Sequence, residues 1–132
     1  MNSKQLEAKI HEMVEYFHTY DLDGLIGMFA DNAVVLNFTN EERIGHQAIR
    51  DLLTPYFNKE FGEMHFDLGR FDADESTQTV WQQWTMSLTG PDTVSTFQGV
   101  DTFEFKDGLV VRNSVFVKSV EPLTSVAPIE VR

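Results

Sequence analysis

The second half of the chain alternates between apolar and polar side chains over long stretches, which restricts it to a β-sheet. Residues 64–69, 80–89, 97–105 and 109–117 all show this period of two, which places alternate side chains on opposite faces of a strand. Lys106-Asp107-Gly108 separates the last two stretches and is typical of a tight hairpin turn. The pattern therefore predicts a run of antiparallel strands.

Helical periodicity is confined to the first half of the chain. We expect helices over residues 3–20, after Asp21 with Leu25, Ile26, Met28 and Phe29 as its apolar residues, and over residues 46–58. Between the last two helices we expect a turn at residues 30–33, a strand at 34–38 and a loop at 39–45. Helices followed by antiparallel strands predict an α+β fold, with the helices packed on one face of a curved sheet.

Length and charge narrow the domain organisation and the class of partner. The chain has 132 residues with a net charge of −11 and no cysteine. We expect one domain over residues 1–132, with a core at about 5–118 and an irregular tail at 119–132. A surface this acidic repels nucleic acid and anionic membranes, so neither is expected as a main partner. No apolar signal-peptide core or membrane-spanning run is present, and we expect a cytoplasmic protein.

Asp101 is the most informative polar residue, because it lies on the apolar face of its predicted strand. Its face is shared by three phenylalanines, Phe97, Phe103 and Phe105. A carboxylate in such surroundings is unfavourable unless it is paired, hydrogen-bonded or protonated. Asp101 is therefore our candidate catalytic acid or base. The alternative is a structural carboxylate that accepts bonds from backbone amides or pairs with Arg112.

Several short segments, together with the order of elements, resemble the NTF2-like superfamily and, within it, the SnoaL-like group. The segments are residues 20–25, 28–34, 44–49 and 97–103, and the resemblance extends over about residues 5–118. It implies a cone-shaped, cystatin-like fold in which a strongly bent, mostly antiparallel sheet wraps around three helices and an apolar pocket. Members include ketosteroid isomerases, polyketide cyclases, dehydratases and epoxide hydrolases, and also non-catalytic binding proteins. Many are homodimers through the outer face of the sheet.

The resemblance to the isomerases and cyclases of this family also indicates which residues fall at their catalytic positions. The isomerase pattern of a tyrosine, an aspartate base and a neutral aspartate falls on Met13, Asn37 and Asp101. Met13 and Asn37 lack the required chemistry. The cyclase pattern, with one aspartate as acid and base, fits Asp101 better, although none of the four histidines lies on a later strand. We expect no cofactor and no metal, because the histidines lack ligand-like spacing.

The resemblance also implies which side chains line the pocket. We expect ligand contacts from Met13, Phe17, Tyr56, Trp84, Phe103 and Phe116. Asn37 has two interpretations, since it can polarise a ligand carbonyl or cap the turn after its strand. Ser114 and Phe116 share a face and are expected beside Asp101 on the neighbouring strand.

These observations favour a protein that holds a small, apolar, carbonyl-bearing molecule. If it is an enzyme, Asp101 supplies acid–base chemistry for isomerisation, cyclisation or dehydration, and Asn37 polarises the carbonyl. The alternative is a non-catalytic ligand-binding protein or a dimeric accessory domain of the same fold.

Overall fold

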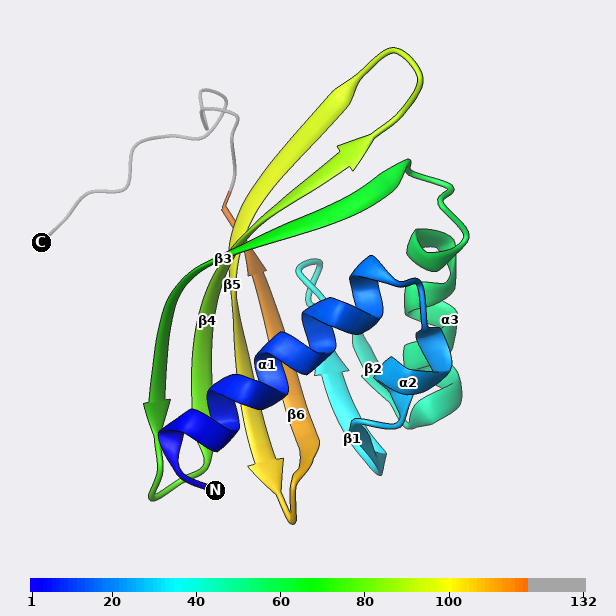
Figure 1. The fold of residues 1–132 in the computed structure, drawn as a ribbon. Helices are drawn as coiled ribbons and strands as arrows, with labels where there is room; N and C mark the ends of the chain where they lie inside the picture. The colour runs from blue at the N-terminus through cyan, green and yellow to red at the C-terminus, as the bar shows by residue number, and fades with distance from the viewer. Residues whose placement is uncertain (119–132) are drawn as a thin grey trace, which may run out of the picture.

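The structure is a computed structural model that describes residues 1–118, so the irregular tail predicted for residues 119–132 lies outside the described residues. The elements follow one another along the chain as α1 (Ser3–His18), α2 (Leu22–Ile26), β1 (Phe29–Leu36), β2 (Glu42–Ile44), α3 (His46–Phe57), β3 (Glu63–Asp74), β4 (Thr79–Thr89), β5 (Val94–Lys106) and β6 (Leu109–Val117) (Figure 1).

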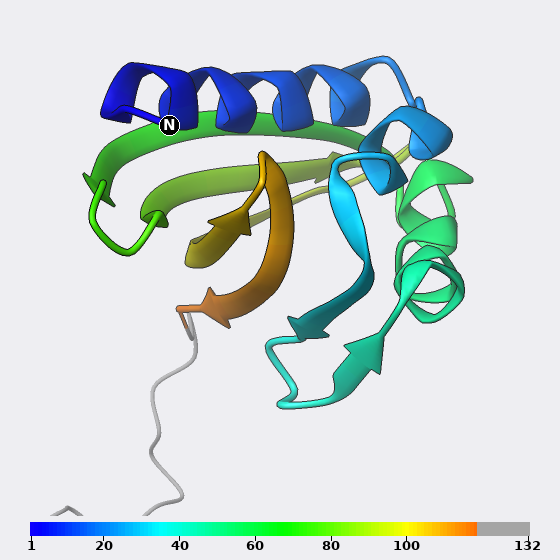
Figure 2. The ribbon, with the colours of Figure 1, turned by 90° about the horizontal axis from the view of Figure 1, so that it is seen from below.

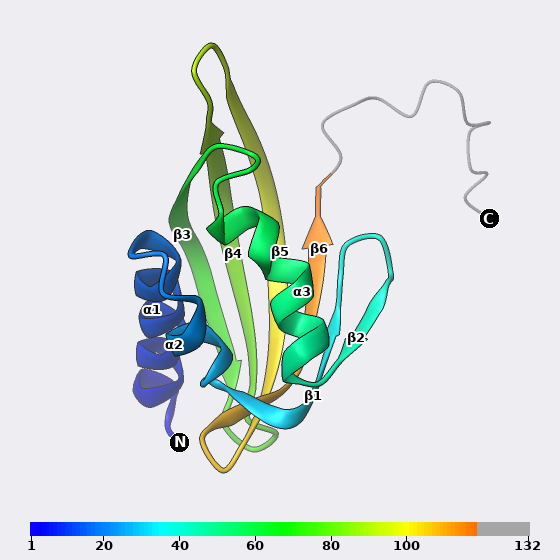
Figure 3. The same cartoon turned by 90° about the vertical axis from the view of Figure 1, so that its right-hand side faces the viewer.

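All six strands form one sheet in the order β2-β1-β6-β5-β4-β3. Neighbouring strands are antiparallel except β1 and β6, which are parallel. Seen from below, the sheet curves strongly and the helices lie along its concave side (Figure 2). The view in Figure 3 shows α1 and α3 on the same side of the long strands. This arrangement confirms the predicted α+β fold with helices packed in a bent, mostly antiparallel sheet.

Helix α1 is fixed at both ends by hydrogen bonds. Asn2 caps its first turn with a capping box to Gln5, which satisfies amide groups that would otherwise lack a partner. Near its end, Nε2 of His18 accepts the backbone N–H of Phe66 at 3.0 Å, and its ring stacks on His65. His18 therefore joins α1 to β3 as a structural residue.

The structure corrects two local predictions in the first half of the chain. Phe29 and the predicted turn at residues 30–33 belong to β1, with an irregular register between Phe29 and Val34. Residues 42–44, predicted as loop, form β2. In both places strand pairing decides the outcome, since β1 pairs with the distant β6 on one side and with the nearby β2 on the other. Local turn propensity is a weak guide where such pairing is available.

Candidate functional site

The concave side of the sheet encloses a cavity of about 540 Å³, which is in the usual size range for small-molecule sites. Side chains from α1, α3, β1 and the inner faces of β3 to β6 line it. Most are apolar or aromatic, and they include five of the predicted ligand contacts: Met13, Phe17, Tyr56, Trp84 and Phe103. The long strands thus contribute their apolar face to a cavity as well as to the core.

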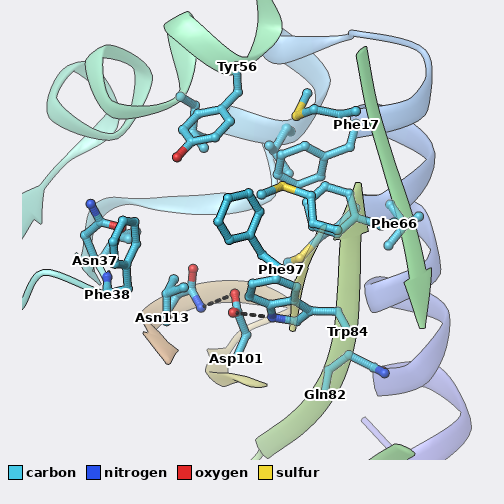
Figure 4. A pocket seen from close by; sticks show the side chains of 18 of the residues that line it. Phe17, Asn37, Phe38, Tyr56, Phe66, Gln82, Trp84, Phe97, Asp101 and Asn113 are labelled. Atoms are coloured by element: carbon cyan, nitrogen blue, oxygen red, sulfur yellow. Dashed lines mark hydrogen bonds between the residues drawn. The ribbon is translucent and has the colours of Figure 1, made fainter. Parts of the chain in front are cut away.

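Asp101 lies on the inner face of β5, where its carboxyl group faces the cavity and accepts two side-chain hydrogen bonds (Figure 4). The indole N–H of Trp84 donates to Oδ1 at 2.8 Å, and the amide Nδ2 of Asn113 donates to Oδ2 at 3.1 Å. Trp84 comes from β4 and Asn113 from β6, the two strands on either side of β5. Sheet pairing therefore brings the three groups together from positions far apart in the sequence.

Burial raises the pKa of Asp101 to about 6, although the hydrogen bonds from Asn113 and Trp84 act in the opposite direction. Desolvation disfavours the charged form of a carboxyl group, whereas donors favour it. The lining residues within 1–118 include no lysine, arginine or histidine. The predicted alternative of a pair with Arg112 is wrong, because Arg112 lies 3.8 Å from Glu104 instead. The other alternative, bonding to backbone amides, is not seen within residues 1–118 either, since both donors to Asp101 there are side chains.

Gly99 creates the space in which Trp84 reaches Asp101. The two residues are directly paired across β4 and β5, so their side chains would share one face. A Cβ atom on Gly99 would collide with the Trp84 ring and with the backbone oxygen of Phe116. The absence of a side chain lets the indole lie over β5, and its N–H then meets the carboxyl group two residues along the strand.

Asn37 lies where β1 ends and contributes both to a turn and to the cavity wall. Its Oδ1 accepts the backbone N–H of Phe38 at 2.9 Å, and its own N–H donates to Glu41. The side chain also lines the cavity. The side-chain oxygen of Asn37 therefore caps the turn. Its Nδ2 group donates to no protein acceptor among the described residues.

Two exposed phenylalanines that sequence reasoning missed also line the cavity. Phe38 follows β1 and Phe61 follows α3, and each is 54% exposed. Tyr56 packs against Phe61 with their ring centroids 5.0 Å apart. Burial raises the pKa of Tyr56, so its hydroxyl stays neutral at physiological pH. Phe61 lies in a loop and carries no periodic signal. Phe38 was predicted as the last residue of the strand at 34–38, but it lies beyond the end of β1 at Leu36.

Asn113 and Gln82 are polar residues of the inner face whose role as cavity lining was also not predicted. Both are buried and both line the cavity. The signal that singled out Asp101 applies to them as well. Asn113 shares its face of β6 with Val115 and Val117, which also line the cavity. Gln82 shares its face of β4 with Val80 and Trp84.

Phe116 is the one predicted ligand contact that the structure places elsewhere. It is 60% exposed and does not line the cavity. The residue opposite Asp101 on β6 is Val115, and directly paired residues share a face. Phe116 and Ser114 therefore lie on the outer face of the sheet, so the expectation that they flank Asp101 is wrong. The pairing register, which the sequence does not specify, decides this point.

Within residues 1–118 no group of three or more histidine, aspartate or glutamate side chains is arranged to hold a metal ion. In the same part of the chain, no helix combines the length and apolar character needed to cross a membrane.

Comparison with solved structures finds close agreement in fold at low sequence identity. An epoxide hydrolase/cyclase-like enzyme, SalBIII, described in pyran ring formation of the polyether salinomycin, is 20% identical with a TM-score of 0.79, covering 89% of this chain and 93% of that one. A putative polyketide cyclase from Xanthomonas campestris pv. campestris is 15% identical with a TM-score of 0.71, covering 88% and 92%. An NTF-2 like protein of unknown function from Burkholderia xenovorans is 15% identical with a TM-score of 0.69, covering 96% and 97%.

A search of curated proteins finds no match. The model of one protein family, the SnoaL-like domain, matches residues 10–113. This range includes α2, α3 and β1 to β5 in full, together with Asp101 and its partners Trp84 and Asn113. By sequence and by fold, the chain belongs to the SnoaL-like domain family, within the NTF2-like, cystatin-like architecture.

Proposed function

We propose that the cavity binds a small, largely apolar carbonyl compound and that Asp101 acts on it as a general base and then as a general acid. The observation that carries this proposal is a carboxyl group held in an apolar cavity without a cationic partner among residues 1–118. A catalytic group works best when its pKa lies near the working pH, and the pKa of Asp101 is raised to about 6.

The ionised carboxylate takes the first step. At pH 7 a group with a pKa of about 6 is ionised in roughly tenfold excess. Asp101 removes a proton from the carbon next to the carbonyl, and the electron pair moves onto the carbonyl oxygen. The protonated Asp101 then returns the proton to a different carbon for isomerisation, or to a departing hydroxyl group for dehydration. The developing oxyanion needs a hydrogen-bond donor, which the Asn37 amide or the Tyr56 hydroxyl supplies.

Trp84 and Asn113 hold the carboxyl group in position for this transfer. Each occupies one carboxylate oxygen with one hydrogen bond. A carboxylate offers about four lone-pair sites, so both oxygens retain acceptor capacity toward a ligand. A base held by its neighbours also loses less conformational freedom when the substrate arrives.

Deuterium exchange tests proton abstraction without knowledge of the natural substrate. The probe is 2-tetralone in D₂O, whose protons next to the carbonyl are followed by NMR. We expect the protein to accelerate loss of these proton signals and Asp101→Asn to remove the acceleration. Glu104→Gln is the matched control, because it neutralises an exposed carboxyl group on the opposite face of the same strand. Equal exchange by the wild type and Asp101→Asn would exclude Asp101 as the base.

A non-catalytic binding function is the second candidate, and one observation favours it. Asp101 is the only carboxyl group among the described residues that line the cavity, and Asn37 occupies the position at which the similar isomerases have their base. Binding of 2-tetralone without accelerated exchange supports this second candidate over the first.

We also propose that the outer face of the sheet forms a homodimer. Trp81 on β4 and Phe116 on β6 are 42% and 60% exposed, and the β5 residues between them, Val100 and Thr102, carry no charge. Interface cores are poor in charge and rich in aromatic side chains. Sedimentation of the wild type as a dimer and of the double variant Trp81→Glu/Phe116→Glu as a folded monomer would support this interface. A wild-type monomer at high concentration would exclude it.

A further inference from the structure

The polar groups around Asp101 leave hydrogen-bond acceptors, and not donors, directed at the cavity. The indole N–H of Trp84 is used by Asp101. The Nδ2 group of Asn113 donates to Asp101 and to the backbone carbonyl of Thr102, each at 3.1 Å. Because both neighbours of this amide are acceptors, its nitrogen must face them and its oxygen must face the other way. In Figure 4 the Asn113 oxygen points away from Asp101, toward the side of the cavity where Tyr56 lies.

Gln82, the other buried amide of the inner face, follows the same pattern. Its Nε2 group donates to the backbone carbonyls of Gly69, Arg70 and Gln83, so this donor is also used by the protein. A ligand that reaches this part of the cavity therefore meets the carboxylate oxygens of Asp101 and the amide oxygen of Asn113. A ligand that brings its own donors satisfies these acceptors, whereas a ligand acceptor placed against them leaves buried polar groups unpaired.

The charge in this part of the cavity is negative and is not balanced by the protein. From α1, α3, β1, β3, β4 and β6, the lining residues within 1–118 contribute no other carboxyl group and no lysine, arginine or histidine. Among the described residues of the lining, Tyr56 is the one other titratable side chain, and burial raises its pKa. A buried carboxylate is costly unless it is paired, and a bound cation would provide the missing partner.

Aromatic rings surround the carboxyl group. The indole of Trp84 bonds to Asp101 directly and lies edge to face with Phe66, with centroids 6.0 Å apart. Phe66 in turn packs on Phe17 at 4.9 Å, and Phe97 lies close by in Figure 4. The faces of such rings attract cations. The net charge of −11 adds a general attraction for cations at the protein surface.

We propose that the cavity accepts a ligand with a protonated amine on an apolar body. The ammonium group donates hydrogen bonds to the carboxylate of Asp101 and to the amide oxygen of Asn113, and the apolar body lies among the aromatic side chains. This inference goes beyond the proposed carbonyl compound and names a second ligand class, a cationic amine, for the same cavity. It rests only on the cavity binding a small apolar molecule, and not on catalysis by Asp101.

Isothermal titration calorimetry with three matched probes tests the inference: 4-phenylbutylamine, the neutral 4-phenylbutan-1-ol and the anionic 4-phenylbutanoate. At about pH 8 we expect the amine to bind on the order of tenfold tighter than the alcohol, and the anion to bind weakest. Asp101→Asn should bring the amine and the alcohol within about twofold of each other. Glu104→Gln, which removes one negative charge outside the cavity, should leave the difference intact.

A pH series on the wild type gives an answer even if Asp101→Asn does not fold. The amine stays protonated up to roughly pH 10, so only the protein changes its charge over the measured range. Affinity for the amine should fall about tenfold between about pH 8 and pH 5, as Asp101 takes up its proton near its pKa of about 6. Affinity for the alcohol should stay nearly constant.

Three results would overturn the inference: equal affinity for amine and alcohol, an amine affinity independent of pH, or an amine preference that persists in a folded Asp101→Asn variant. The exchange assay with 2-tetralone contains no amine, so its outcome is separate. Exchange without amine preference leaves the proposed acid–base function standing and removes this inference. Amine preference without exchange does the reverse.

Discussion

Strand β5 carries two carboxyl groups three residues apart, and they differ because they lie on opposite faces of the same sheet. Asp101 faces the cavity, accepts bonds from Trp84 and Asn113, and has a pKa raised to about 6 by burial. Glu104 faces outward at 49% side-chain exposure, where its nearest cation is Arg112 at 3.8 Å. Water solvates the carboxylate of Glu104, whereas mostly apolar side chains surround that of Asp101.

The comparison shows that a strand can hold a reactive group and a solubilising group with the same functional chemistry. Alternation along β5 assigns each carboxyl group to its face. The neighbouring strands then determine its partners, since β4 and β6 present Trp84 and Asn113 on the inner side and Arg112 on the outer side. Changes to one carboxyl group, to its neighbours or to the pH should therefore affect the two faces unequally.

Neutralising each carboxyl group in turn should give the largest effect, a difference between the two variants in the rate of 2-tetralone exchange. Asp101→Asn is expected to reduce 2-tetralone exchange by at least about 100-fold, because general-base catalysis is typically worth 10²–10⁴. Glu104→Gln should retain the wild-type rate. The readout is the NMR signal of the exchanging protons, with circular dichroism to show that both variants are folded. A comparable loss in both variants would mean that charge in general, and not the inner carboxyl group, controls the rate.

Stability should depend on pH through Asp101 in the direction that its raised pKa dictates. The folded protein binds the Asp101 proton up to about pH 6, whereas the unfolded chain loses it near the ordinary value of 3.8. Between these values the folded state holds more protons, so the free energy of unfolding falls as the pH rises. The loss is about 3 kcal/mol in total.

Urea unfolding of the wild type and Asp101→Asn at about pH 4 and pH 7.5 measures this effect as a change in their difference. Taking the difference removes the titration of every other group. The wild type should lose about 2 kcal/mol relative to the variant across this range, because part of the total loss occurs below pH 4. The same comparison with Glu104→Gln should stay nearly flat, and a flat result for Asp101→Asn would show that its carboxyl group is better solvated than the structure indicates.

Filling the space at Gly99 should change the surroundings of Asp101 indirectly, by displacing its hydrogen-bond donor Trp84. In Gly99→Ala the new methyl group collides with the Trp84 ring and the backbone oxygen of Phe116, which should cost about 1–3 kcal/mol of stability. Displacement of Trp84 should also weaken its bond to Asp101 and shift the tryptophan fluorescence. Gly27→Ala is the matched control, because its new methyl group would meet atoms no closer than 3.4 Å. Similar stability losses in both variants would contradict a special role for Gly99.

Removing the outer ion pair should have the smallest effect. Arg112 and Glu104 are 47% and 49% exposed and 3.8 Å apart, and exposed pairs contribute at most about 1 kcal/mol. Arg112→Ala should therefore lower the free energy of unfolding by less than about 1 kcal/mol and leave exchange of 2-tetralone unchanged. The test is denaturant unfolding together with the exchange assay. A large loss of exchange would show that the outer face communicates with the cavity.

The long strands and their faces are the part of the fold that the sequence predicts best. The boundaries of β6 agree with the prediction, and the apolar face of β4, from Val80 through Trp84 to Leu88, points inward. Strict alternation over many residues leaves one consistent assignment. The short elements are predicted poorly, as residues 30–33 and 42–44 show, because a three-residue strand such as β2 carries almost no periodic signal.

The candidate site, like the fold, could be predicted from the sequence only in part. The sequence by itself determined that Asp101 lies among phenylalanines on one face of its strand, because the period of a strand fixes which side chains share a face. Only the tertiary structure decided that Trp84 and Asn113 bond to it, that Arg112 does not, and that Phe116 lies outside the cavity. Those outcomes depend on the register between strands, and a shift of one residue moves every side chain of a strand to the other face.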